Sequence, residues 1–438
     1  MDQKLYAIED LVLKQLVGKF AEHSEDENRK TFIYTAAKNI KPDISESELG
    51  EIYADVNDLA PIKDLLESNT IEDITVNNTK NIYVFDSLRG FVKLDASFDS
   101  QEKLNRFVGK LKLYATNQQA HGKIMDVHMP SGSRANIITS PVGYDVTIRN
   151  FKQKPLSIID LINNRTLDYK IASRLWLYVD GLRVKPANLM IGGIPASGKT
   201  TLLNTLFSFF RPEKRIVTIE ETYELNTEAH DNTARLETNT DLPMTELVKN
   251  ALRMRPDLII IGEIRGAEAN DLAMAMNIGK ISMGTIHAST SRDVILRLEH
   301  SPMDVPRDII PVIDAIVVVS SLYRDGKPQR KVVQISEISG IETQVLLSDV
   351  FKYDYKTNQA APMMPSITYR DNLSKMVGVS PSEILAEEAV RARILEQLNI
   401  MGKRDMKSIS EAVSAYYDNP EALLRSLGLG QLSPAVPV

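Results

Sequence analysis

The pattern of apolar and polar positions divides the chain into two halves. In the front half the predicted helices and strands come in separate runs, whereas in the rear half helices and strands alternate. Residues 1–60 carry short helix-like apolar runs around the charged segment from Glu22 to Lys30, so we expect a helical lead-in there. From Ile71 the period changes to two, which is typical of strands with one buried face. With a helical stretch from Glu102 to Ala115, this pattern predicts an α+β domain over residues 61–152. Its predicted strands are 71–76, 82–85, 90–94, 135–138 and 145–149.

Residues 171–345 alternate apolar runs with helical patterns, which is typical of a parallel sheet connected by helices. The polar, Pro-containing stretch 153–170 is the predicted linker before this domain. Residues 346–425 predict a mainly helical C-terminal region, and 426–438, rich in Gly, Ser and Pro, a flexible tail. The predicted strands of the rear half are 189–191, 215–219, 258–261, 281–286 and 315–319, and the predicted helices between them are 171–181, 244–254 and 267–277.

Composition and charge then narrow the class of protein. A chain of 438 residues, 43% hydrophobic and 25% charged, is an ordinary globular sequence long enough for two or more domains. The formal net charge of -6 argues against a surface built to hold nucleic acid, so we expect no stable nucleic-acid partner. The absence of cysteine excludes disulfides, thiolate zinc sites and cysteine nucleophiles. With no long apolar run and no signal-peptide pattern, we expect a cytoplasmic protein.

The strongest chemical signal is a phosphate-binding loop between an apolar strand and the helix opened by Leu202. Residues Gly193 to Thr200 match G-x-x-x-x-G-K-[ST]. Its glycines let successive backbone N–H groups face phosphate oxygens, while Lys199 reaches the β- and γ-phosphates and the Thr200 hydroxyl holds Mg²⁺. The sequence therefore predicts ATP and Mg²⁺ as cofactors. The residues expected at the nucleotide are Gly193, Ile194, Pro195, Ala196, Ser197, Gly198, Lys199, Thr200 and Thr201.

Two other apolar strands end in carboxylates, at Glu263 and at the pair Glu220-Glu221. The carboxyl ends of parallel strands meet at one edge of a sheet, so we expect these groups beside the phosphate loop. Glu263 is predicted to hold Mg²⁺ through water. Because side chains alternate along a strand, only one of the pair faces the γ-phosphate. We favour Glu220 as the group that orients or deprotonates the attacking water, with a structural or Mg²⁺-shell role as the alternative.

His287 follows another strand and is a candidate donor to the γ-phosphate or to a neighbouring subunit, although a single His is more often structural. Four motifs in this order resemble those of the type II/type IV secretion ATPases, where they are named Walker A, Asp box, Walker B and His box. They are Gly193–Thr200, Thr218–Leu225, Ile261–Ala269 and Thr285–Ala288. The resemblance covers residues 60–345 strongly, and the C-terminal part is most similar to the archaeal pilus, archaellum and secretion branch. The Asp box departs from the family in reading Glu-Glu where Glu-Asp is usual.

The resemblance implies an α/β fold with a RecA-like P-loop ATPase core, an N-terminal α+β (PAS-like) domain and a helical C-terminal region. It also implies a homo-hexameric ring at the cytoplasmic face of the membrane, with ATP held between the two domains. Hydrolysis would then act on a polytopic membrane platform protein and, through it, on pilin-like subunits. In such proteins front-domain arginines reach the triphosphate, and the matching positions are Arg134 and Arg149. Arg235, Arg253 and Arg255 are further candidates that the sequence leaves unranked.

The predicted catalytic set is Lys199, Glu220, Glu263, Arg134, Arg149 and His287. Three functions remain open with it. The first is a motor ATPase for the assembly or secretion of pilus-like filaments, and the second is a type IV secretion ATPase that moves protein or DNA. The third is a nucleotide-binding scaffold that switches without turnover, which is disfavoured because Lys199, Glu220 and Glu263 are all present.

Overall fold

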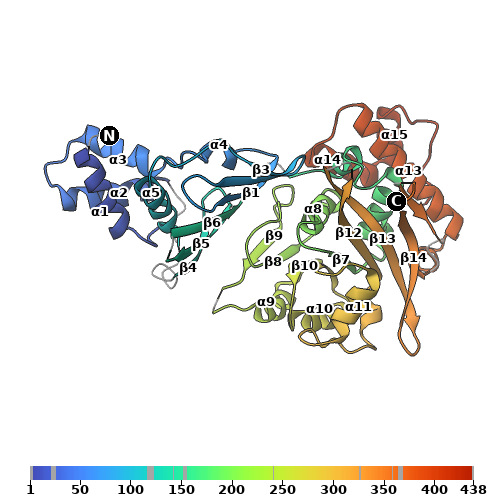
Figure 1. Ribbon diagram of the computed structural model, residues 1–438. Helices are drawn as coiled ribbons and strands as arrows, with labels where there is room; N and C mark the ends of the chain where they lie inside the picture. The colour runs from blue at the N-terminus through green and yellow to red at the C-terminus, as the bar shows by residue number, and fades with distance from the viewer. Residues whose placement is uncertain are drawn as a thin grey trace. The chain divides into compact units, whose positions relative to one another are not determined.

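The computed structural model describes residues 3–20, 26–115, 123–141, 143–150, 155–239, 241–324, 327–357, 359–363 and 368–436 (Figure 1). The chain divides into two compact units, Met1–Lys154 with Gly326–Pro328, and Pro155–Asp325 with Gln329–Val438. Residues 153–154 of the predicted linker and residues 437–438 of the predicted tail lie outside the described residues. The described part of the linker contains a helix, α6 (Ile158–Asn163), which begins at a capping box formed by Ser157 and Asp160.

Helices open the first unit, where we expected a helical lead-in. They are α1 (Gln3–Gln15), α2 (Asp26–Ile40), α3 (Glu46–Val56) and the short α4 (Lys63–Leu66). α3 begins at a capping box, in which the Ser45 side chain accepts the N–H of Glu48 and the Glu48 side chain accepts the N–H of Ser45. Buried Val12, Ile33 and Ile52 join α1, α2 and α3 in one small core.

The described remainder of the first unit is a six-stranded antiparallel sheet in the order β3-β2-β1-β6-β5-β4. Alternate residues such as Ile74 bury one face of the sheet against Phe107 of helix α5, which explains the period-two pattern. β4 was not predicted, and it buries only Met125 and Val127. The elements are β1 (Ile71–Val76), β2 (Ile82–Asp86), β3 (Gly90–Lys93), α5 (Gln101–Lys112), β4 (Ile124–His128), β5 (Arg134–Ser140) and β6 (Gly143–Arg149).

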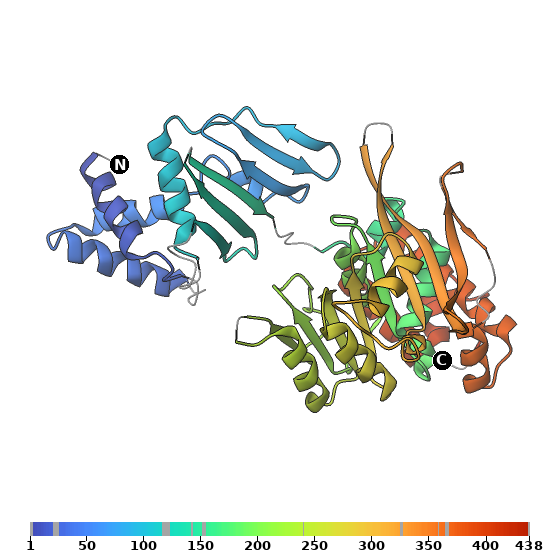
Figure 2. The same cartoon turned by 60° about the horizontal axis from the view of Figure 1, so that its bottom comes forward.

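The second unit is built on one sheet whose described strands have the order β15-β14-β13-β12-β7-β11-β10-β8-β9 (Figure 2). β12, β7, β11, β10, β8 and β9 are parallel, which confirms the predicted parallel sheet. β13, β14 and β15 pair antiparallel and extend the sheet beyond residue 345, where we expected the ATPase domain to end. The strands are β7 (Leu189–Gly193), β8 (Ile216–Glu220), β9 (Thr233–Glu237), β10 (Leu258–Ile264), β11 (Ile281–Ile286), β12 (Ala315–Arg324), β13 (Lys327–Ile341), β14 (Val345–Asp354) and β15 (Gln359–Pro362).

Successive residues of the central strands enter two cores, one on each face of the sheet. Ile191 and Ile260 pack in a core with α6, α7, α8 and the C-terminal helices, whereas Met190 and Ile261 pack in a core with α9, α10 and α11. Figure 1 shows these last three helices together on one side of the sheet. Strands buried on both faces read as continuous apolar runs, which made them recognisable. The helices are α7 (Tyr169–Asp180), α8 (Lys199–Thr205), α9 (Met244–Ala251), α10 (Glu268–Asn277), α11 (Ser291–Glu299), α12 (Thr368–Val377), α13 (Pro381–Ile400), α14 (Met406–Asp418) and α15 (Pro420–Ser426), with 3-10 turns η1 (Gly181–Arg183), η2 (Leu206–Phe209), η3 (Leu252–Met254) and η4 (Ile310–Val312).

Buried charges join α7 to the C-terminal helices. The guanidinium of Arg391, in α13, is fully buried and donates to Asp180 and to Glu387, each at 2.8 Å. It also lies over the ring of Trp176, 4.9 Å from the centroid. Burial raises the pKa of Asp180 to about 6, although Arg391 acts in the opposite direction. The helices predicted as a separate C-terminal region therefore complete one core of the second unit.

No helix in the described ranges is long and apolar enough to cross a membrane. The twenty-residue helix α13 carries charged side chains, among them Glu387 and Arg391.

Candidate nucleotide-binding and hydrolysis site

The phosphate loop leaves the fully buried strand β7 and enters α8. Ala196 and Gly198 adopt positive φ angles of 58° and 95°, so the chain turns back sharply before Lys199. A Cβ atom on Gly193 would lie 2.3 Å from Ser197 Oγ and 2.5 Å from the Val319 carbonyl oxygen. Only glycine fits at that position, as the predicted phosphate loop requires.

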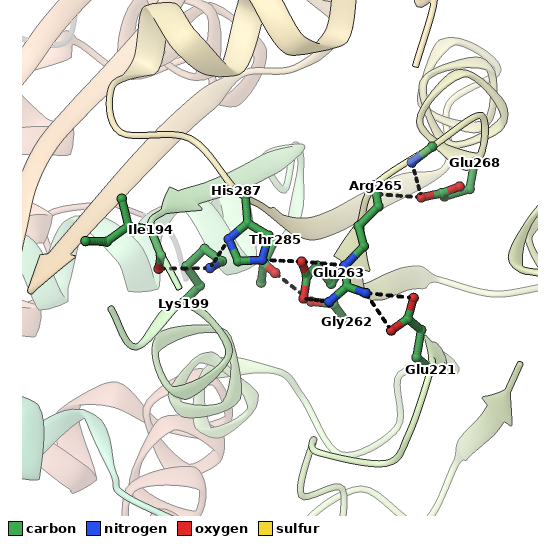
Figure 3. Close-up of polar contacts among 10 residues, drawn as sticks. Ile194, Lys199, Glu221, Gly262, Glu263, Arg265, Glu268, Thr285 and His287 are labelled. Atoms are coloured by element: carbon green, nitrogen blue, oxygen red, sulfur yellow. Dashed lines mark hydrogen bonds and ion pairs between the residues drawn. The ribbon is translucent and has the colours of Figure 1, made fainter. Parts of the chain in front are cut away.

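Lys199 is directed across the edge of the sheet (Figure 3). Its side chain is 6% exposed, and Nζ donates to the Ile194 carbonyl at 3.2 Å. Nζ also lies 3.2 Å from Nδ1 of His287, which directly follows β11. Burial and the Lys199 charge lower the pKa of His287, so the imidazole is neutral near pH 7 and its Nδ1 accepts from the ammonium group.

The neutral imidazole connects Lys199 to the predicted metal residue. His287 Nε2 donates to Glu263 Oε1, and Glu263 is also held by Arg265, whose Nε and Nη2 lie 2.8 and 3.0 Å from its two oxygens. Although burial opposes the charge, these hydrogen bonds and positive neighbours lower the pKa of Glu263. The pairing of β10 with β11 shifts register between Ile261 and Ile264, the stretch that contains Glu263. In the same stretch, Thr285 Oγ1 donates to the Gly262 carbonyl at 2.6 Å.

The two neighbouring glutamates at the end of β8 have different surroundings. Glu220 is 1% exposed, and its Oε1 accepts the N–H groups of Glu224 and Leu225 at 2.8 and 2.9 Å. Its Oε2 is buried and makes no hydrogen bond within the described residues. Burial raises the pKa of Glu220 to about 7. Glu221 instead is 46% exposed and binds Arg265, so only Glu220 has the environment of a general base.

The residues present fit ATP and Mg²⁺. The glycine cradle at Gly193 has no room for a side chain, and Ser197 Oγ is buried without a hydrogen bond in the described part of the chain. Both features suit a loop that meets phosphate oxygens. The described residues contain no cluster of three or more His, Asp or Glu side chains able to hold a metal ion. A Mg²⁺ ion at Thr200 and Glu263, which stays a prediction, would need further ligands from the nucleotide and water.

A cavity of about 540 Å³ lies beside the phosphate loop. Arg265 and His287 line it together with Ile194 and Pro195 of the loop, so these two polar side chains face open space. Its other lining residues are Ala288, Ser289, Asp293, Leu296, Arg297, His300, Ser301, Pro302 and Met303.

The predicted arginine pair lies in the first unit. Arg134 and Arg149 are register partners on the adjacent strands β5 and β6. Arg149 is also the partner of Asp73 on β1, so the arginines follow one row across the sheet. Their role at the nucleotide stays a prediction.

The three arginines that the sequence left unranked lie at different places in the second unit. Arg235, on β9, lies over the Tyr223 ring at 4.2 Å, and Nη2 donates to the Leu225 carbonyl at 3.0 Å, in the loop that holds Glu220. Arg253 and Arg255 precede the first residue of β10 and so belong to the opposite edge of the sheet from the phosphate loop. Of these three arginines, Arg235 is therefore the one that lies near Glu220 within the same chain.

Sequence reasoning assigned no role to two arginines that the structure brings to the site. Arg265 follows Glu263 by two positions and comes directly after β10 ends at Ile264, and in extended chain this spacing indicates a shared side, a signal that could have found it. Arg330, on β13, donates from Nε to the Ala196 carbonyl at 3.1 Å. No local pattern marks Arg330, because the contact depends on how β13 passes the phosphate loop.

Comparisons with known proteins agree with these motifs. The family model described as type II/IV secretion system protein matches residues 55–349. An uncharacterized protein of Methanocaldococcus jannaschii is 30% identical over 397 residues, which are 86% of this chain and 71% of that protein. The conjugal transfer protein TrbB of Rhizobium radiobacter is 29% identical over 219 residues, which are 49% of this chain and 65% of that protein. The ATPase DotB of Legionella pneumophila has a solved structure that is similar over 80% of this chain and 94% of its own, at 17% identity and a TM-score of 0.49.

The matched range includes the phosphate loop, both carboxylate strands and His287. The order β12-β7-β11-β10-β8, with the phosphate loop after β7, is that of a RecA-like P-loop core, so this part of the predicted fold is confirmed. The PAS-like type of the first unit stays a prediction. The family recognised from the four motifs is confirmed by the match over most of the chain: the protein belongs to the type II/IV secretion system protein family.

Proposed function

We propose that this protein is a hexameric motor ATPase that hydrolyses ATP to power the assembly or secretion of pilus-like filaments. The observation that carries the proposal is the convergence of four strand ends on one edge of the sheet. The phosphate loop follows β7, Glu220 ends β8, Glu263 lies in β10 and His287 follows β11. Lys199, His287 and Glu263 form one hydrogen-bonded string across that edge, which supports their acting on one substrate.

In the proposed reaction the phosphate loop binds the triphosphate and Lys199 neutralises its β- and γ-phosphates. Thr200 and Glu263 hold Mg²⁺, which neutralises phosphate charge and orients the triphosphate when bound. Glu220 takes a proton from the attacking water as the water oxygen bonds to the γ-phosphorus. The bond from that phosphorus to the bridging oxygen breaks, and the bridging oxygen leaves with ADP. Arg134 and Arg149 supply charge to the triphosphate from the first unit.

The proposal includes a homo-hexameric ring, a cytoplasmic location at the inner face of the membrane, and a polytopic platform protein that passes the motion to pilin-like subunits. The family assignment supports these partners. A type IV secretion ATPase that moves protein or DNA is the second candidate. It is favoured by the similarity to the conjugal transfer protein TrbB, which covers 49% of this chain. A scaffold that binds nucleotide without turnover is disfavoured by the buried Glu220.

The experiment is to measure Mg²⁺-dependent ATP hydrolysis and light scattering on the purified chain at several concentrations. We expect turnover that rises more than linearly with dilute protein concentration, as subunits of 49.0 kDa assemble into hexamers. A monomer with full specific activity at every concentration would exclude the ring. A pilin-like subunit and platform protein copurifying with the chain would favour the first candidate, whereas a secreted protein or DNA would favour the second.

A further inference from the structure

Arg265 lies between two carboxylates at the edge of the sheet, and its contacts are unequal. Toward Glu263 it is bidentate, with Nε 2.8 Å from Oε1 and Nη2 3.0 Å from Oε2. Toward Glu221 it presents the third nitrogen, Nη1, at 3.2 Å from Oε1 and 3.0 Å from Oε2. One guanidinium thus uses all of its nitrogens to join Glu263 of β10 to Glu221, the residue that follows β8 (Figure 3).

The backbone that carries Arg265 is fixed, whereas its side chain is open to water. The buried Glu268 accepts the N–H of Arg265 at 2.6 Å and the N–H of Gly266 at 2.7 Å through the same oxygen. The Arg265 side chain is 56% exposed and lines the cavity beside the phosphate loop. The guanidinium therefore has a fixed base and free space in which to turn.

In this arrangement both oxygens of Glu263 are occupied by cationic or neutral donors. Arg265 holds each of them, and His287 holds Oε1 as well. A carboxylate that accepts a bidentate guanidinium has little remaining capacity for the water shell of a divalent cation. Arg265 and a hydrated metal ion at Glu263 therefore compete for the same oxygen atoms.

We propose that Arg265 is an exchangeable counter-ion that blocks Glu263 until Mg²⁺-nucleotide arrives, and that Glu221 is the positioning residue that receives it on release. The inference rests on the proposed function, since it concerns the metal requirement of the same site. It also gives the two adjacent glutamates different roles: the buried Glu220 is the proposed base, and Glu221 holds the arginine. Glu221 is suited to this because Nη1 stays bound to it while Nε and Nη2 leave Glu263.

The test is the Mg²⁺ concentration that half-saturates binding of a fluorescent, non-hydrolysable ATP analogue to the full chain. Arg265→Lys keeps the charge but loses the fork, so we expect the half-saturating Mg²⁺ concentration to fall by about two- to fivefold. Glu221→Gln removes the receiving partner, so we expect that concentration to rise by a similar factor. In the Arg265→Lys background, Glu221→Gln should have no further effect, because the fork it acts through is gone.

Arg393→Lys and Glu396→Gln are the matched controls, because these residues form an exposed pair at 2.6 Å on α13. Neither should shift the Mg²⁺ requirement. If only net charge mattered, Arg265→Lys would have the Mg²⁺ requirement of wild type, and Glu221→Gln would shift that requirement equally in the wild-type and Arg265→Lys proteins. Either result overturns the inference. Wild-type protein that binds no nucleotide at any Mg²⁺ concentration would overturn the proposed function as well, so the two failures are distinguishable. Melting curves check that each variant is folded.

Discussion

Arg391 donates to Asp180 at 2.8 Å inside the core of the second unit, although 211 residues separate the two along the chain. Asp180 ends the helix that precedes the phosphate-loop strand, and Arg391 belongs to the C-terminal helices. The contact therefore links α7, which precedes the phosphate-loop strand, to a region that the sequence predicts to be separate.

Removing this buried cation should destabilise the protein strongly. Arg391→Met would leave the carboxylates of Asp180 and Glu387 buried without their counter-ion, which costs about 3–5 kcal/mol of unfolding free energy. Arg393→Met, two positions along on the exposed side of α13, should change it by less than about 0.5 kcal/mol. Urea unfolding of both variants is the measurement, and equal stabilities would contradict the structural role of the Arg391 network.

The phosphate-loop lysine gives a prediction about turnover. Lys199→Ala removes the cation nearest the expected β- and γ-phosphates, so steady-state ATP hydrolysis should fall by at least about 100-fold. The fold should survive, because Lys199 belongs to neither hydrophobic core of the second unit. Lys249→Ala, at an exposed ion pair on α9, is the control. Unchanged hydrolysis in the Lys199 variant would refute the assignment of the loop.

The contrast between Glu220 and Glu221 is also testable. Glu220→Gln should lower turnover by about 10²–10⁴-fold while nucleotide stays bound, because a general base is lost. Glu221→Gln should keep far more of the activity at saturating Mg²⁺. Turnover and fluorescent-nucleotide affinity are measured side by side, and the reverse order of the two variants would show that the wrong neighbour was chosen.

The environment of Glu220 predicts the pH dependence. Burial raises its pKa to about 7, and a base acts only when deprotonated, so turnover should rise with pH through about 7 and level off above it. His287 does not produce this step, because burial and Lys199 lower its pKa and it is already neutral there. The check is kcat between about pH 5.5 and 8.5, with Glu220→Gln lacking the step; a flat wild-type profile would count against Glu220 as the base.

The arginine row of the first unit gives a prediction that separates geometry from charge. Arg134→Lys and Arg149→Lys each remove a guanidinium fork, whose charge-assisted hydrogen bond is worth about 1.5–3 kcal/mol, so turnover should fall by roughly 10- to 150-fold. Nucleotide affinity should fall less, because the phosphate loop is intact. Arg89→Lys, on the β2–β3 turn of the same sheet, is the control. Wild-type turnover in both variants would show that this sheet does not serve the reaction.

Local patterns predicted the phosphate loop and the strands that end at it. Runs such as Leu258–Ile261 are apolar on both faces, and their order along the chain places Glu220, Glu263 and His287 at one edge once the sheet is parallel. The contacts of Arg265 and Arg330 were not predicted, because they depend on strand order and on the path of β13. Buried Arg391 was also missed, since a charged residue on a helix normally indicates a solvated face.

The core that contains Ile158 also contains Val436. During synthesis, the parallel sheet and phosphate loop leave the ribosome before the C-terminal helices that pack on α7 and η2 and complete that core. At about 5–20 residues per second, residues 346–436 take roughly 5–20 s to follow. Throughout that interval the apolar residues of this core that the C-terminal helices will cover are exposed to water. We therefore expect the second unit to need a chaperone after the phosphate loop is made.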